Sequence, residues 1–186
     1  MTIAVISLGS NLGFAGAAGV AGTPGADLRD PERLLRLALQ ELQALSALPL
    51  TTSSFYRTAP IDCPPGAQDF INAIALLRVA RELTADKLLE HLHLIETRFG
   101  RQRDGIRNQP RTLDLDLISF GALQCAGSRL TLPHPRAHQR LFVMAPLAEV
   151  APDLKLPGQA LTAAQLARQL QGGQQVAALA SNTNKM

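Results

Sequence analysis

The chain has 186 residues, of which 46% are hydrophobic and 18% charged, and its formal net charge is +3. This length allows a buried core, so we expect a single domain over residues 1–186, and the apolar content excludes a disordered chain. A pI near 9.3 favours an anionic partner, either a nucleotide or a nucleic acid. Cys63 and Cys125 lie far apart and lack metal-ligand spacing, so we do not expect a disulfide framework. A reducing cytoplasm fits this pattern. Residues 3–22 lack a basic leader, so we expect neither a signal peptide nor a membrane span.

The first half of the chain alternates between strand and helix patterns. Asp30 is a good N-cap and Pro31 suits the first helical turn, so a helix is predicted to begin there. Its apolar face consists of Leu34, Leu35, Ala38, Leu42 and Leu45. The elements predicted around this helix are a strand at 2–8, a Gly/Ala-rich loop at 14–26, a β-prone segment at 50–58, a loop at 59–66 and a buried strand at 70–79.

The second half begins with a helix that Thr84 caps and Gly100 ends. The apolar face of this helix consists of Leu88, Leu92, Ile95 and Phe99. The elements predicted after it are a strand from 113 to 120, a short strand at 129–132, a helix at 140–150 that Pro146 interrupts, a short helix at 163–170 and a frayed polar tail.

This order, strand, helix, strand, strand, helix, strand, indicates a fold class. It is the βαββαβ pattern of a ferredoxin-like α+β sandwich. The residues that follow add an elaborated C-terminal region to it.

The most informative segment is Pro-Arg-Thr-Leu-Asp-Leu-Asp-Leu at residues 110–117. Leucines alternate with Asp114 and Asp116, and this period of two predicts a strand with the leucines in the core and both carboxylates on the opposite face. The two Cα atoms should lie about 6.7 Å apart, close enough for both carboxylates to reach the same cation or pair of cations. A few oxygen ligands suit Mg²⁺, which also binds phosphate oxygens. The alternative is an ordinary solvated strand face.

Basic residues are concentrated just before this strand. Residues 98–111 contain five arginines and one acid, Asp104, which gives a local charge of five minus one, or +4. Arginine matches phosphate oxygens with a planar fork of donors and keeps its charge. An arginine-rich loop beside paired carboxylates therefore predicts a site for a metal and a polyphosphate.

Several motifs occur together in a familiar order. They are SLGSNLG, SSFYRTAP, the strand containing Asn72, RTLDLDL, and LPHPR followed by Arg140 and Phe142. Over about residues 2–152 the chain resembles the 6-hydroxymethyl-7,8-dihydropterin pyrophosphokinases of folate biosynthesis. The resemblance implies transfer of the β,γ-pyrophosphoryl group of ATP to the hydroxymethyl oxygen of the dihydropterin, with release of AMP. It also implies a monomeric, cytoplasmic enzyme that uses two Mg²⁺ ions and binds neither nucleic acid nor a membrane.

The same resemblance implies roles for individual residues. Asp114 and Asp116 would hold the metals, and these two with Arg101 and Arg111 would form the catalytic set. The residues expected on the ATP side are His93, Glu96, Arg101, Arg111, Leu117, Arg129, Thr131, His134 and Arg140. Those expected to bind the pterin are Thr58, Ile61, Phe70, Asn72 and Phe142, with the two phenylalanine rings sandwiching the heterocycle.

The residues themselves also allow simpler interpretations. Phe70 and Phe142 could be core aromatics, whereas a buried Asn72 in an apolar strand requires a hydrogen-bond partner. Two other functions remain open at this point. A two-metal nucleotidyltransferase or nuclease also uses paired carboxylates, but it would be expected to carry a third acid. A non-catalytic RNA-binding module would need aromatic residues and lysines on central strands, and the chain has only three lysines.

Overall fold

The computed structural model describes residues 1–12, 30–59, 68–101 and 112–179. The predicted loop at 14–26, Ile61, Cys63 and Arg111 lie outside these residues. The described elements are β1 (Thr2–Ser10), α1 (Pro31–Gln43), β2 (Thr51–Thr52), β3 (Tyr56–Thr58), β4 (Phe70–Val79), α2 (Ala85–Arg98), β5 (Asp114–Phe120), β6 (Cys125–Ala126), β7 (Thr131–Leu132), a 3₁₀ turn (Ala137–Gln139), α3 (Leu141–Val150), α4 (Ala163–Leu170) and β8 (Ala177–Ala178).

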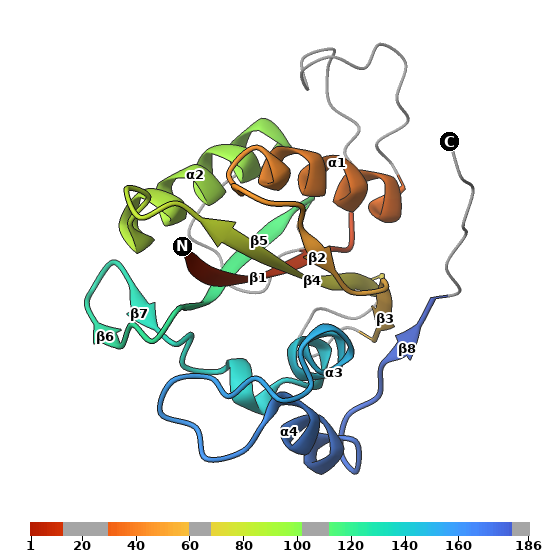
Figure 1. Ribbon diagram of the computed structural model, residues 1–186. Helices are drawn as coiled ribbons and strands as arrows, with labels where there is room; N and C mark the ends of the chain where they lie inside the picture. Colours follow the sequence, from red (N-terminus) through yellow and green to blue (C-terminus); the bar gives the residue numbers. More distant parts are fainter. Residues whose placement is uncertain (13–29, 60–67, 102–111, 180–186) are drawn as a thin grey trace.

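The fold is a mixed α/β arrangement around one antiparallel sheet (Figure 1). The strands follow the order β5-β1-β4-β3-β8, and β2 also pairs with β4. Strand β1 is therefore central, with β4 on one side and β5 on the other. Strands β6 and β7 form a separate two-stranded sheet.

Helices cover both faces of the sheet (Figure 1). Helices α1 and α2 lie on one face, where Leu34, Leu92 and Phe99 pack against Ile6 and other strand residues. Helices α3 and α4 lie on the other face and form a second core with the strand residues Val5, Ile74, Leu76 and Ile118. The elaborated C-terminal region thus forms the third layer of the fold, on the face of the sheet opposite α1 and α2.

The sequence predicted the main helix starts and the longest strand correctly. The Asp30 side chain accepts a hydrogen bond from the Glu32 N–H at 3.0 Å, and Thr84 caps α2 through the Lys87 N–H at 3.4 Å. The strand expected at residues 70–79 is confirmed. The β-prone segment 50–58 is divided into β2 and β3, although Ser53 between them still donates its N–H to the Ile74 carbonyl at 3.0 Å.

Two predictions for the C-terminal third were wrong. Helix α3 runs through Pro146, because proline removes only one intrahelical hydrogen bond and its ring is buried in the core. The predicted fraying of the polar tail is wrong for its described part, because Ala177 and Ala178 pair with β3 as strand β8, whereas residues 180–186 lie outside the described residues. The backbone groups at the free edge of β3 are stabilised when another strand pairs with them. The polar composition of the tail gave no sign that the tail would provide this strand.

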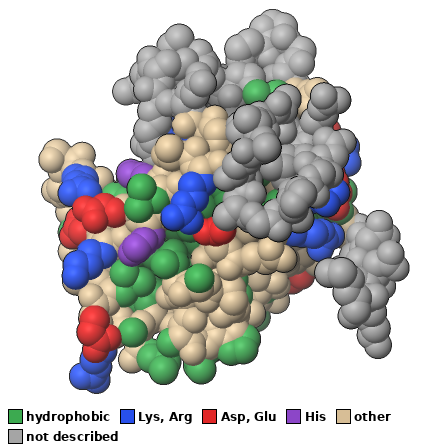
Figure 2. All heavy atoms as spheres, turned by 90° about the horizontal axis from the view of Figure 1, so that it is seen from above, with side chains coloured by type: hydrophobic (Ala, Val, Ile, Leu, Met, Phe, Trp, Pro, Cys, Tyr) green, Lys and Arg blue, Asp and Glu red, His purple; other side chains and the backbone are tan. Residues whose placement is uncertain are grey.

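The surface seen in Figure 2 carries basic, acidic and histidine side chains close to one another. Several exposed arginines pair with acids on α1 and α2, as Arg98 does with Glu41 at 3.0 Å and Arg129 with Glu90 at 2.6 Å. These arginines are therefore engaged in ion pairs on the surface. None of the described helices has both the length and the apolar character that a membrane span requires.

Candidate active site

One residue of the predicted metal pair and one predicted pterin-binding residue lie in a single row across three strands. Gly9 of β1 pairs with Asn72 of β4 on one side and with Asp114 of β5 on the other. Directly paired residues of antiparallel strands point to the same face, so Asn72 and Asp114 share the face that α3 covers in part. Asp116 lies on this face opposite Ser7, whereas Leu113, Leu115 and Leu117 are buried under α1 and α2. The predicted alternation of β5 is confirmed.

Gly9 has a specific role in this row. A Cβ atom at this position would lie 3.2 Å from Asn72 Oδ1 and 3.9 Å from Asp114 Cβ. A larger residue would therefore displace the Asn72 amide. Sequence analysis did not single out Gly9, although a glycine inside a strand is a known sign of close approach by another group.

The Asn72 amide is buried and oriented by a neighbour. Its side chain is 4% exposed, and Nδ2 donates a hydrogen bond to Thr58 Oγ1 at 2.8 Å. Thr58 pairs in turn with Phe70, so these three residues lie on the same face of β3 and β4. The prediction that Asn72 needs a partner is confirmed.

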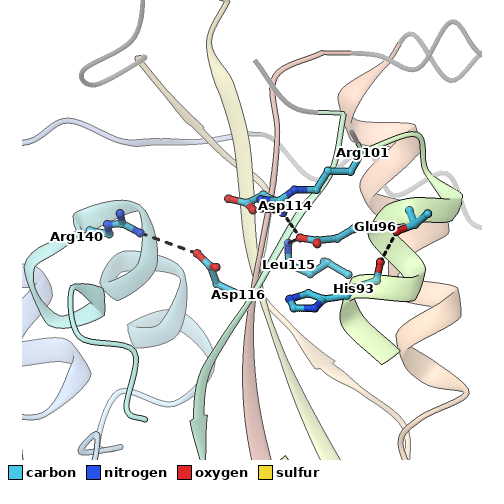
Figure 3. Close-up of polar contacts among 8 residues, drawn as sticks. His93, Glu96, Arg101, Asp114, Leu115, Asp116 and Arg140 are labelled. Atoms are coloured by element: carbon cyan, nitrogen blue, oxygen red, sulfur yellow. Dashed lines mark hydrogen bonds and ion pairs between the residues drawn. The ribbon is translucent and has the colours of Figure 1, made fainter. Parts of the chain in front are cut away.

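The turn at the C-terminus of α2 places Arg101 next to β5. Gly100 has a φ of 80°, and the N–H groups of Gly100 and Arg101 donate to the carbonyls of Thr97 and Glu96 at 3.0 Å each. This is a Schellman motif, in which glycine adopts the left-handed conformation. The chain therefore turns back, and the Arg101 guanidinium donates to both the Glu96 and the Asp114 carboxylates (Figure 3).

Glu96 is a buried acid behind the paired aspartates. Its side chain is only 1% exposed, and Oε1 also accepts a hydrogen bond from the Leu115 N–H at 2.8 Å. Burial alone would lower the pKa of Arg101, but the negative charges of Asp114 and Glu96 outweigh burial and raise it. Glu96 is thus a buried acid on α2. It ties α2, Arg101 and β5 together.

Asp116 lies in surroundings that disfavour the ionised form of its carboxyl group. Burial, followed by the charge of Asp114, raises the pKa of Asp116 from 3.8 to about 6, although Arg140 acts in the opposite direction. The Asp116 side chain is nevertheless 37% exposed, and Arg140 Nη1 lies 4.0 Å from Oδ2. An acid whose ionised form is disfavoured by a neighbouring carboxylate, on an accessible face, has the chemistry of a site for hard cations, since a cation shared by Asp114 and Asp116 would remove the repulsion. Among the described residues, no group of three or more His, Cys, Asp or Glu side chains is placed to hold a metal ion.

Helix α3 contributes the opposite wall of the site. Arg140 precedes this helix and points toward Asp116 (Figure 3), and its guanidinium carbon lies 5.4 Å from the centre of the Phe142 ring. His134 is tied to β5 by a 2.8 Å hydrogen bond from its N–H to the Ile118 carbonyl. Burial and the charges of Arg140 and Arg136 lower the pKa of His134 to about 4, so its ring is neutral at physiological pH.

The remaining predicted residues are placed less centrally. His93 lies on α2 one turn before Glu96. Leu117 is 4% exposed and belongs to the core under α1 and α2. Arg129 pairs with Glu90 at the surface, and Thr131 Oγ1 donates to the Gly127 carbonyl at 3.3 Å. Arg111 and Ile61 lie outside the described residues. The structure thus brings together Asp114, Asp116, Glu96, Arg101, His134 and Arg140 on one side, and Thr58, Phe70 and Asn72 on the other.

Comparison with known proteins agrees with this geometry. Residues 5–152 match the sequence model of the 7,8-dihydro-6-hydroxymethylpterin-pyrophosphokinase family. The chain belongs to this family. It is 41% identical over 158 residues to the 2-amino-4-hydroxy-6-hydroxymethyldihydropteridine pyrophosphokinase of Haemophilus influenzae, with 84% of this chain and 86% of that protein aligned. The protein of the same name from Bacillus subtilis is 36% identical over 154 residues, covering 82% of this chain and 80% of the relative.

Solved structures support the same fold. A crystal structure of an HPPK-DHPS in complex with substrates superposes with a TM-score of 0.63 at 12% sequence identity. The match covers 90% of this chain and 43% of that longer chain, so this chain spans less than half of it. The predicted function is confirmed at the level of the family, whose members transfer pyrophosphate from ATP to hydroxymethyldihydropterin in folate synthesis. This decides against the nucleotidyltransferase and the RNA-binding module.

Proposed function

We propose that this chain carries out the family's reaction on the α3-facing side of its sheet, with Asp114 and Asp116 as the ligands of two Mg²⁺ ions. The observation that carries the proposal is the row Asn72–Gly9–Asp114, because it puts an amide that can recognise a heterocycle beside the acidic pair. When bound, the metal ions would neutralise phosphate charge and lower the pKa of the attacking hydroxyl.

The residues of the chain would supply positioning and charge. Arg101 is held between two carboxylates, so it can shift donors to phosphate oxygens without losing its charge. Arg140 lies on the other side of Asp116 and can contact the same polyphosphate. Arg111, His93, Leu117, Arg129, Thr131 and His134 complete the proposed ATP side. Pre-arranged donors of this kind are the main source of catalysis in phosphoryl transfer.

The pterin would lie over the opposite end of the row. Thr58 uses its hydroxyl to orient the Asn72 amide, which leaves Asn72 Oδ1 and one N–H for the edge of the heterocycle. Phe70 and Phe142 would stack on its two faces, and the backbone near Ile61 would add a hydrogen bond. A buried amide discriminates strongly, since a ligand that leaves it unpaired pays a desolvation cost.

We further propose that the sheet order represents a ferredoxin-like core, and that the chain works as a single-domain, cytoplasmic monomer that binds neither nucleic acid nor membranes. Family membership and the sheet order support the first point.

The test is AMP release from ATP and Mg²⁺ with and without 6-hydroxymethyl-7,8-dihydropterin. We expect AMP only when the pterin is present, and no ADP. Asp116→Ala should abolish turnover, while Asp153→Ala, a change at an exposed acid remote from the acidic pair in sequence, should not. Full activity in Asp116→Ala would refute the metal assignment.

A second variant tests the pterin side separately. Asn72→Ala should weaken pterin binding by about tenfold or more while changing ATP binding little, because it removes one oriented amide. Equal losses for the two ligands would place the pterin elsewhere.

A further inference from the structure

A C-terminal segment outside the family match contacts the backbone around Arg140. The family match ends at residue 152, and the segment from 171 to 179 follows α4. The Gln174 side chain in this segment bridges two backbone groups. Its Oε1 accepts the Leu141 N–H at 2.8 Å, and its Nε2 donates to the Gln139 carbonyl at 2.9 Å. These two groups flank Arg140 on either side.

The first turn of α3 needs such a partner. The first N–H groups of a helix have no intrahelical acceptor, and a side chain before the helix usually supplies one. Arg140 is the N-cap residue of α3, in an extended conformation, and it makes no side-chain cap. Gln174, which is 33 residues further along the chain, provides the missing acceptor.

Gln174 is itself held at both ends of its segment. Its own N–H donates to the Leu170 carbonyl of α4 at 3.2 Å. Beyond it, Ala177 pairs with Arg57, and the Leu179 N–H donates to the Phe55 carbonyl at 2.7 Å. A clamp anchored on α4 and on β3 can resist movement of the chain at Arg140.

A fixed backbone at Arg140 matters because it determines where the Arg140 side chain can reach. Its guanidinium lies 4.0 Å from Asp116 and over the Phe142 ring. A long arginine side chain has many rotamers, so a fixed direction of its Cα–Cβ bond lowers the entropy lost when it engages a ligand.

We propose that Gln174 is a positioning residue that holds Arg140 toward Asp116 for the ATP side of the reaction. This inference rests on the proposed function. It assigns a catalytic contribution to a residue beyond the segment that the family match covers.

The test uses Gln174→Met, which keeps the length of the side chain but removes its amide. Gln175→Met is the matched control, because Gln175 is the exposed neighbour in the same segment. We expect Gln174→Met to lower kcat/KM for ATP by about tenfold, as loss of two hydrogen bonds allows, and to change the KM for pterin by less than about twofold. Gln174→Glu, which keeps an acceptor for Leu141, offers a second variant should Gln174→Met fold poorly.

Two further measurements separate positioning from general stability. Hydrogen exchange of the Leu141 amide should accelerate in Gln174→Met but not in Gln175→Met. In an Arg140→Ala background the same Gln174→Met change should cost less than about twofold, because the two residues act together. The same tenfold loss in both backgrounds, or no loss in either, would overturn the inference. A wild-type protein that releases no AMP would instead overturn the proposed function, and the exchange of Leu141 would still report on the clamp.

Discussion

Replacing Asp116 by asparagine should stabilise the metal-free protein while removing its activity. The carboxylate is desolvated and faces Asp114, and both effects raise its pKa from 3.8 to about 6. Because the pKa in the folded state is above the unfolded value, the ionised carboxylate destabilises the fold at neutral pH. That penalty shrinks as the pH falls from above 6 toward 3.8. Asparagine keeps the shape and removes the charge.

The size of the effect follows from the pKa difference. A difference of about 2 corresponds to about 3 kcal/mol if it is counted in full. The Asp116 side chain is 37% exposed, so solvent screening reduces the gain to roughly 1–2 kcal/mol. For a chain of this length we expect the Tm to rise by about 2–8 °C.

The assay is thermal unfolding of wild type, Asp116→Asn and the control Asp153→Asn, without metal, at about pH 7.5 and about pH 4. The gain should appear in Asp116→Asn alone and should largely disappear at the lower pH. Millimolar Mg²⁺ with a non-hydrolysable ATP analogue should raise the Tm of wild type more than that of the variant, since the variant lacks one of the two proposed metal ligands. A variant without any gain in Tm, or with a gain that is the same at both pH values, would refute the electrostatic reasoning.

Three other predictions test the surroundings of the site. Glu96→Ala should lower the free energy of unfolding by about 3 kcal/mol, because it removes a buried acceptor of the Leu115 N–H; urea denaturation showing a loss below about 1 kcal/mol would contradict this. Burial and then the hydrogen bond to Glu149 raise the pKa of Tyr56 to about 12. Because this is the single tyrosine, an ultraviolet pH titration should report that pKa directly, and Glu149→Gln should lower it. The His134 ring should titrate by NMR near pH 4 and not near 6.5, and an ordinary value would mean that the ring is solvated.

Local signals predicted much of the fold. Asp30, Pro31 and Thr84 predicted the helix starts, because caps act within a few residues. The alternation around Asp114 predicted the orientation of β5, because the leucines must be buried.

Features that depend on distant partners were not predictable in this way. Helix α3 tolerates Pro146 because of the core that surrounds it, and β8 forms because β3 has a free edge. The burial of Glu96 requires both Arg101 and the Leu115 N–H, and only the Schellman motif at Gly100 hinted that Arg101 turns back. The Gln174 bridge to the start of α3 has no local sequence signal, since glutamine caps helices poorly by type.

The central place of β1 in the sheet also sets when the site can exist during synthesis. Residues 2–10 pair with β4 and with β5, whose residues emerge from the ribosome about 60 to 110 positions later. At roughly 5–20 residues per second, the apolar first strand waits on the order of 5–20 seconds for its second partner. Until then neither Asp114 nor Asp116 has a sheet to lie on. The paired carboxylates can therefore take their places on the sheet only late in synthesis, once β5 has joined β1.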